Sequence, residues 1–268
     1  MKKRRTTTQN ILWFTWKDMT HPAAGGAELL NEEIIRRLAA RGYKVTLIVG
    51  GYTNCTHKSK KDGYTIIRVG SKYTVYFAAW RYARKHLKHW PDIVIDEINV
   101  MPFFARLYMR RPTYLFVHQL ARKVWFYEMP KILGLIGYLA EPLYLFMLRT
   151  SRVITVSNST RSDLMKYGFK RENIDIISEG LSIAPIRSIA SITKRSAPTL
   201  LSLGHFRPMK RTLEHIELFD MSKARIPNLQ LIIAGDSQSS YGRKVLERIE
   251  ASPYSDDITY MGLSLIHI

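Results

Sequence analysis

Two short stretches of the chain combine glycines or cations with the start of a helical pattern. The first, His21 to Glu28, contains Gly25 and Gly26, and the second, Gly204 to Arg211, contains Lys210. Each follows an apolar run that is typical of a buried strand. At the end of such a strand a glycine turn lets backbone N–H groups approach an anion, which the positive end of the next helix attracts. The two stretches together predict a diphosphate-bearing ligand held between two edges, one of them cationic.

Each stretch taken alone also has a purely structural explanation. Gly25 and Gly26 could form only a tight strand-to-helix connection, with Glu28 favouring the helix N-terminus. Lys210 and Arg211 could be solvated cations at the start of a helix. Both alternatives stay open at the level of the single motif.

Composition limits the class of protein. The 268 residues, 46% of them hydrophobic, can bury the core of one large domain or two smaller ones. Because Cys55 is the only cysteine, an intrachain disulfide and a thiolate metal cluster are excluded, which favours the cytoplasm. The formal net charge of +19 implies an anionic partner: nucleic acid, an anionic membrane surface or phosphorylated substrates.

Apolar, strand-like runs alternate with helical patterns in the first two thirds of the chain. A helix is expected from Ala27 to Arg41, stopped by Gly42, and another follows Ser157 and ends near Gly168. The expected strands are Ile11 to Thr15, Lys44 to Val49, Tyr64 to Val69, Asp92 to Ile95, Thr113 to Val117 and Arg152 to Val156. This alternation predicts an α/β fold with a parallel sheet covered by helices on both faces.

A second series of the same kind follows a stretch without clear periodicity, Leu181 to Pro198. We therefore predict two domains, residues 1–185 and 186–268. The expected strands of the second are Thr199 to Leu203, Leu229 to Ala234 and Ile258 to Met261, with helices from Arg211 to about Met221 and near Tyr241 to Glu250. About three strands leave an open edge and an incompletely covered sheet, so this domain is expected to be incomplete.

The ordered set of motifs resembles glycosyltransferase family 4. It comprises Gly25-Gly-Ala-Glu28, Val153-Ile-Thr-Val-Ser157, Ile176-Ile-Ser-Glu-Gly180, Leu203 to Lys210 and Leu231-Ile-Ile-Ala-Gly-Asp236. The resemblance implies a GT-B fold, in which two Rossmann-like domains face each other across a cleft. It also implies a sugar transfer from a nucleotide-diphosphate sugar that retains the anomeric configuration, without a metal or other cofactor.

The same resemblance suggests roles for individual residues. Lys210 matches the lysine that neutralises the diphosphate leaving group, and Gly25 and Gly26 are expected against the donor diphosphate or on the acceptor side. His118 falls where the family often carries a histidine near the donor sugar. UDP- or GDP-sugar is the expected co-substrate, and a lipid-linked or glycan acceptor of cell-envelope polysaccharide synthesis is the expected acceptor.

The chain departs from the family pattern at two points. His205 stands where the family usually has the arginine that accompanies the lysine, and Arg207 is the nearest candidate to replace it. The paired glutamates of the family, Glu-x7-Glu, would lie beyond Ile268. We therefore expect a C-terminally truncated chain that does not turn over donor by itself.

The segment from Arg122 to Arg149 is unusually rich in aromatic and aliphatic residues between basic ends. This pattern favours a peripheral position on an anionic membrane, although a helix pair in the core beside the acceptor site would look similar. Glu141 and Pro142 interrupt the best apolar run, Ile132 to Leu148, so no spanning helix is predicted.

Two other classes remain as alternatives. A nicotinamide-dependent oxidoreductase would carry Gly-x-Gly-x-x-Gly after its first strand, and that fingerprint is absent. A basic protein that binds nucleic acid or membranes without catalysis would explain the charge, but no helix-turn-helix, zinc-finger or RNP-type pattern occurs. Nucleic acid is therefore not an expected partner.

Overall fold

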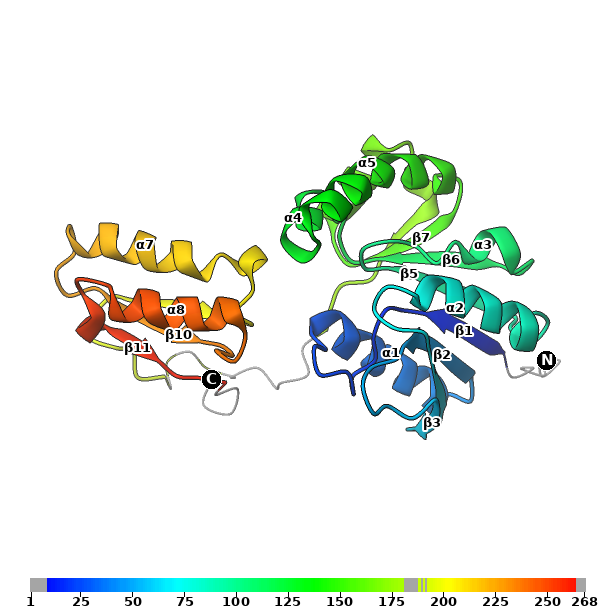
Figure 1. Ribbon diagram of the computed structural model, residues 1–268, viewed down its shortest axis with the longest axis horizontal. Helices are drawn as coiled ribbons and strands as arrows, with labels where there is room; N and C mark the ends of the chain where they lie inside the picture. Colours follow the sequence, from blue (N-terminus) through cyan, green and yellow to red (C-terminus); the bar gives the residue numbers. More distant parts are fainter. Residues whose placement is uncertain (1–8, 181–187, 189, 191, 264–268) are drawn as a thin grey trace. The chain divides into compact units, whose positions relative to one another are not determined.

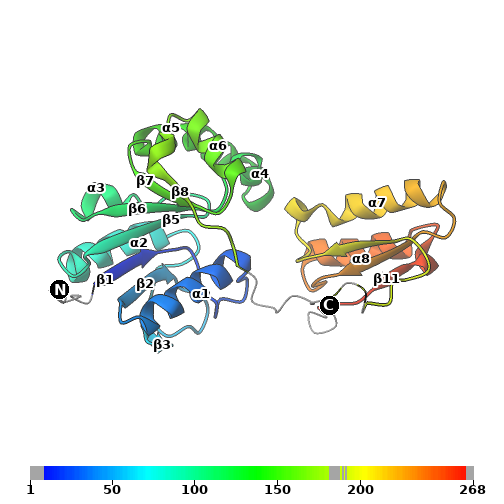
Figure 2. The same ribbon diagram turned by 180° about the vertical axis from the view of Figure 1, so that it is seen from behind.

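The computed structural model describes residues 9–180, 188, 190 and 192–263. The chain divides into two compact units, Met1–Leu181 and Ser182–Ile268 (Figures 1 and 2). The boundary predicted between residues 185 and 186 lies outside the described residues. Each unit contains its own sheet, and the two are considered separately.

The first unit is built on an eight-stranded sheet with the order β3-β4-β2-β1-β5-β6-β7-β8. Only β3 is antiparallel to its neighbour. The strands are β1 (Asn10–Phe14), β2 (Lys44–Gly50), β3 (Lys58–Lys61), β4 (Tyr64–Val69), β5 (Ile93–Ile98), β6 (Thr113–Val117), β7 (Arg152–Thr155) and β8 (Ile174–Ile176). The six strands expected here from the sequence are confirmed with end shifts of a residue or a few, whereas β3 and β8 were not expected as strands.

Helices cover both faces of this sheet, as predicted. The α1 helix packs on one face through Ile35, against Trp13 and Val45, and the other helices of this sheet lie on the opposite face (Figure 1). The helices of the first unit are α1 (Gly26–Ala40), α2 (Val75–Tyr82), α3 (Ala105–Tyr108), α4 (Trp125–Glu128), α5 (Lys131–Leu148) and α6 (Asn158–Lys166), with a π-helical turn at Ala83–Leu87 and 3-10 turns at Arg122–Val124 and Arg171–Asn173. A right-handed crossover places its helix on one face of the sheet when the chain moves toward β4 and on the other face when it moves toward β8. The two directions meet between β1 and β5, so the helices change face at this point.

Local sequence signals explain several helix ends. The Ser157 hydroxyl accepts the Thr160 backbone N–H at 3.2 Å, which is the expected N-cap of α6. Gly42 and Gly168 have φ values of +88° and +86°, the left-handed conformation that ends α1 and α6. The caps predicted from the sequence are confirmed at these positions.

The α5 helix corrects one expectation. It runs through Glu141 and Pro142 without a break, and it is the one helix in the described ranges that is long and apolar enough to cross a membrane. Glu141 faces the unit and is only 2% exposed, because its carboxylate accepts the backbone N–H groups of Ala121 and Arg122 at 2.8 and 2.6 Å. Backbone donors from the preceding loop therefore bind one face of a helix whose sequence suggested an interruption.

The second unit contains three parallel strands in the order β11-β10-β9, as expected. Its elements are β9 (Thr199–Leu203), a 3-10 turn (Pro208–Lys210), α7 (Thr212–Lys223), β10 (Gln230–Ala234), α8 (Ser240–Glu250), a 3-10 turn (Ser255–Asp257) and β11 (Ile258–Tyr260). Both helices pack on one face, through Ile216 and Val245 against Ile233. On β9, Leu201 and Leu203 remain 58% and 51% exposed, so within residues 192–263 this sheet is incompletely covered, as predicted.

Candidate functional site

The carboxyl ends of β1 and β5 meet at the topological switch point of the first unit. Open α/β sheets bind ligands in the crevice beyond such a point. Asn99, directly after β5, donates to the Thr15 hydroxyl at 3.3 Å and joins the two strand ends. The loop from β1 to Gly25, and His118 after β6, lie at the same edge of the sheet because the strands are parallel.

Part of the positive potential at the turn of Gly25 and Gly26 is already compensated by a carboxylate of the same chain. The Glu28 carboxylate accepts the Gly25 backbone N–H at 2.7 Å, and Lys17 lies 3.5 Å from the same carboxylate. Glu28 is 5% exposed and sits in the first turn of α1, where a negative charge is stabilised. The Gly25 N–H therefore already has a partner within the chain, and the role of Gly25 at a ligand stays a prediction.

At Gly26, as at Gly25, neither packing nor backbone conformation requires a glycine. A Cβ added at Gly26 would meet no atom within 4 Å, and Gly26 is not among the residues with positive φ. The open space beside its backbone is consistent with the approach of a ligand.

We expect Gly26→Ala to leave the melting temperature unchanged or slightly higher, since alanine stabilises a helix by about 0.5–1 kcal/mol relative to glycine. Transfer activity of the complete protein should fall at least tenfold if ligand and backbone are in contact, because a methyl group would separate them. Circular dichroism melts and initial rates measure the two effects. Equal activity in the variant would assign Gly26 to the connection alone.

His118 lies at the end of β6 beside a buried carboxylate. In the β5–β6 register Glu97 pairs with Phe116, which puts His118, two residues further on, on the same face as Glu97. Its Nε2 is 3.3 Å from Glu97 Oε1, and its ring contacts that of Phe116 at a centroid distance of 4.6 Å. The His118 side chain is 12% exposed, so it borders the edge of the site without being solvated.

Glu97 also receives three hydrogen bonds from other elements. Its Oε2 accepts Trp13 Nε1 at 3.0 Å and Asn31 Nδ2 at 2.6 Å, and its Oε1 accepts Asn99 Nδ2 at 2.9 Å. Asn31 belongs to the helix that begins at Gly26. Glu97 therefore connects the helix of the glycine turn with His118, a relationship that the sequence did not reveal.

Asp96 and Glu97 have no joint role, as expected for neighbours on a strand. Asp96 points to the other face, where its carboxylate accepts the backbone N–H groups of Phe103 and Ala105, both at 2.8 Å. Complete burial raises the pKa of Asp96 to about 6, against the opposing effect of these two bonds. The carboxylate therefore shapes the loop before α3.

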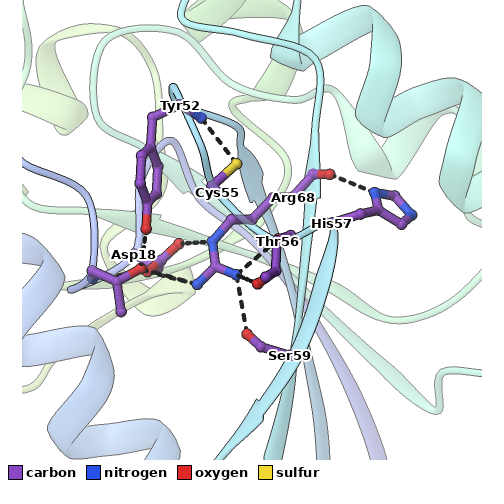
Figure 3. Close-up of polar contacts among 8 residues, drawn as sticks. Asp18, Tyr52, Cys55, Thr56, His57, Ser59 and Arg68 are labelled. Carbon is purple, nitrogen blue, oxygen red and sulfur yellow. Dashed lines mark hydrogen bonds and ion pairs between the residues drawn. The ribbon is translucent and has the colours of Figure 1, made fainter.

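A buried ion pair supports the loop between β1 and α1 (Figure 3). Arg68 on β4 binds Asp18 with two nitrogens, at 2.9 and 3.2 Å, and also donates to Thr20 and Ser59 at 3.0 Å each. The Thr20 hydroxyl in turn lies 2.8 Å from that of Tyr52. Burial alone would raise the pKa of Asp18, but the hydrogen bonds from Arg68 and Thr20 outweigh it and hold that pKa below the ordinary 3.8. The network fixes the start of the loop that leads to the glycine turn.

In the second unit, the sequence-predicted residues follow β9. A small pocket of about 110 Å³ lies at the carboxyl ends of the three strands, lined by Leu203, Gly204, His205, Ala234, Gly235, Gly262 and Leu263. His205 is exposed at this pocket. Arg207 directly precedes the 3-10 turn that ends at Lys210, and its carbonyl accepts the Lys210 N–H at 2.8 Å. Lys210 is exposed, and Arg211 beside it pairs with Glu214 at 3.0 Å. Of the two adjacent cations, Lys210 is the better placed to meet a ligand.

Gly235, which belongs to the motif from Leu231 to Asp236, also lines this pocket. A Cβ at this position would overlap the Gly204 carbonyl oxygen and the Phe206 ring, so only glycine permits the close approach of β9 and β10 that forms the pocket. The glycine directly after an apolar strand was the available signal.

Comparison with known proteins decides the family. A profile of glycosyltransferase family 4 matches residues 24–184. The chain belongs to glycosyltransferase family 4. No match to a curated protein sequence was found. As a member of this family it is a transferase of sugars, which confirms the resemblance inferred from its motifs.

Solved structures show that this family 4 glycosyltransferase has the GT-B type of fold. A glycosyltransferase from Rickettsia africae ESF-5 is 17% identical with a TM-score of 0.64, covering 96% of this chain and 69% of that chain. The lipopolysaccharide outer core galactosyltransferase WaaB is 14% identical with a TM-score of 0.59, covering 97% and 69%. A UDP-forming α,α-trehalose-phosphate synthase from Burkholderia vietnamiensis is 10% identical with a TM-score of 0.56, covering 95% and 72%. The α/β class and the two Rossmann-like units predicted from the sequence agree with this fold.

Proposed function

We propose that this family 4 glycosyltransferase transfers a sugar from UDP- or GDP-sugar to a lipid-linked or glycan acceptor, with retention of configuration. The observation that carries the proposal is the exposed Lys210 on the turn after β9, the strand whose end, with Gly204 and His205, lines a pocket at the carboxyl edge of the second sheet. A structural relative is named for forming UDP, and another for adding galactose to lipopolysaccharide. These names support a nucleotide donor and a cell-envelope acceptor.

The chemistry follows from where charge develops. As the bond between the anomeric carbon and the diphosphate breaks, negative charge grows on the leaving oxygen, and a lysine ammonium stabilises it. The acceptor oxygen forms the new bond to the anomeric carbon on the same face, and its proton passes to the departing diphosphate. Lys210 has the role of charge stabiliser, and Arg207 and His205 lie next to it in the sequence. In the first unit, His118 and Gly26 lie at the carboxyl edge of the sheet. No metal ion is required in this scheme.

Transfer can be measured on the complete protein with labelled UDP- and GDP-sugars and a membrane extract. We expect one released nucleoside diphosphate for each sugar found in the lipid or glycan fraction, and the product should carry the donor's anomeric configuration. Release of nucleotide without a glycosylated product, or inversion at the anomeric carbon, would contradict the proposal.

We also propose a cytoplasmic enzyme that associates peripherally with an anionic membrane through α4 and α5. The outward face of these helices is apolar, with exposed fractions from 41% to 76% for Phe126, Tyr127, Ile132, Leu133, Leu135, Ile136, Tyr138, Leu139, Leu143, Phe146 and Met147. Lys123 and Lys131 are exposed beside it, and the Arg149 guanidinium lies 3.6 Å from the Phe146 ring centroid. Apolar side chains between basic groups are typical of a helix that lies in the plane of an anionic bilayer.

The buried face of α5 supports this orientation over a spanning one. Gly137 allows the Trp125 ring to pack directly against the helix, and Glu141 is bound by backbone donors of the same unit. Of the apolar 18-residue segment, 33% is buried in the protein. A helix held in this way presents only its other side to lipid.

We expect the double substitution Leu139→Glu and Leu143→Glu to reduce binding to phosphatidylglycerol-containing vesicles by at least tenfold, because each buried leucine contributes about 1.5–3 kcal/mol. Both side chains are exposed, at 60% and 72%, so the melting temperature should stay within a few degrees. The double substitution Leu218→Glu and Met221→Glu, at positions on α7 that are 58% and 72% exposed, is the matched control for added charge and should bind as the unsubstituted protein does. Vesicle co-sedimentation measures the effect, and equal binding by all three proteins would exclude this surface.

A further inference from the structure

The contact between His118 and Glu97 leaves one buried polar atom unexplained. His118 Nε2 is buried and has no hydrogen bond within the described residues, although Glu97 Oε1 is 3.3 Å away. Buried polar atoms are nearly always hydrogen-bonded, so such an exception calls for a cause. Hydrogen bonds in unliganded sites are often long or poorly aligned and shorten when the ligand binds. A small rotation of the ring would complete this one.

The surroundings of Glu97 determine which atom must carry the proton. Trp13, Asn31 and Asn99 all donate N–H groups to the carboxylate, and its side chain is 0% exposed. A carboxylate has no hydrogen to donate, so Glu97 can only accept a hydrogen bond from His118. Nε2 can therefore be satisfied at this position only as N–H.

The geometry points to Glu97 as a positioning residue that holds His118 with its proton on Nε2 and so leaves Nδ1 as the ring nitrogen available to a ligand. Neutral His118 then presents a lone pair on Nδ1 at the carboxyl edge of the sheet, suited to accept a hydrogen bond from a sugar hydroxyl. The tautomer follows from the structure alone, whereas the sugar as the ligand rests on the proposed function. At many histidines, a hydrogen bond from one ring nitrogen to a carboxylate holds the proton there and leaves the second nitrogen unprotonated.

Nitrogen-15 NMR of the histidine-labelled chain measures the tautomer directly. We expect the wild-type His118 signals of the neutral ring to show a protonated Nε2 and an unprotonated Nδ1. In Glu97→Gln, the amide oxygen should stay with Trp13 and Asn31, which both bind Oε2, so the amide NH2 would face His118 Nε2. The proton should then move to Nδ1, and the pattern of the two nitrogen signals should be exchanged.

Asp96→Asn is the matched control, because Asp96 is equally buried on the same strand but points to the other face. It should leave the His118 tautomer unchanged. A wild-type His118 protonated on Nδ1 would overturn the proposal even if Glu97→Gln did not fold. An unchanged tautomer in a folded Glu97→Gln variant would overturn it as well.

In the complete protein, Glu97→Gln should lower kcat by about 10- to 100-fold while the donor KM changes much less, as expected for loss of an outer hydrogen-bond partner. A donor KM that rises with kcat unchanged would contradict a role in positioning His118 for the reaction. Absence of sugar transfer in the wild-type protein would instead contradict the proposed function, and it would leave the tautomer result intact.

Discussion

Replacing Lys210 by alanine in the complete protein is expected to lower kcat/KM for sugar transfer by at least 100-fold, or about 2.7–4 kcal/mol of transition-state stabilisation. Lys210 is exposed on the turn after β9, and its neighbour Arg211 is engaged by Glu214. The lost interaction is strongest when the leaving diphosphate carries its full charge. Most of the effect should therefore appear in kcat, and a smaller part in the donor KM.

Lys244→Ala provides a control, because Lys244 is also exposed and lies on α8 of the same unit. Its removal lowers the net charge equally and should change the rate less than twofold. Initial rates with varied donor concentration separate the two constants. Equal rates for Lys210→Ala and Lys244→Ala would remove the assigned role.

Replacing Arg68 by methionine is expected to reduce the free energy of unfolding of the first unit by about 3–5 kcal/mol, because it leaves the Asp18 carboxylate buried without its partner. The side chains of Arg68 and Asp18 are only 4% and 2% exposed, so water cannot replace the lost bonds. For a unit of this size the melting temperature should fall by roughly 6–20 °C. Thermal unfolding followed by circular dichroism measures this change.

The double variant Asp18→Asn, Arg68→Met distinguishes a coupled pair from two independent contributions. It should lose less stability than the sum of the single variants, because no unpaired charge remains. Additive effects of the two substitutions, or a loss below 1 kcal/mol in Arg68→Met, would contradict the account of this network.

The ion pair also predicts a pH dependence. The folded-state pKa of Asp18 is depressed, so the stability that it contributes is complete above its ordinary pKa of 3.8 and is lost as the pH falls through the lower folded value. The difference in stability between wild type and Asp18→Asn should therefore be constant near neutral pH and shrink only in strong acid.

Much of the fold was predictable because its strands are apolar and bounded by turn residues. Thr113–Val117 and Thr199–Leu203 occur with the bounds expected. The β3 strand, Lys58–Lys61, was missed because three lysines carry no apolar alternation, and it forms only by pairing antiparallel with β4 at the sheet edge. Pro142 was expected to interrupt α5, but tertiary packing of Glu141 and its neighbours overrides the local cost of the proline.

The candidate site was less predictable, because its contacts depend on strand register and on helix placement. Gly26 and Lys210 were identified from local motifs and His118 from the family resemblance, and their roles stay predictions. The contact of Glu97 with His118 needs the β5–β6 register and the position of Asn31 on α1, neither of which is written in the local sequence. Likewise, the Glu28 carboxylate can accept the Gly25 N–H only when the first turn of α1 has formed.

Binding of nucleoside diphosphate to the complete protein tests the central claim most directly. We expect UDP or GDP to raise the melting temperature, since a ligand at 100 times its Kd adds about 2.7 kcal/mol to stability. The same titration with Lys210→Ala should give a clearly smaller shift. A folded protein whose melting temperature does not respond to either nucleotide in large excess would contradict a nucleotide-sugar transferase.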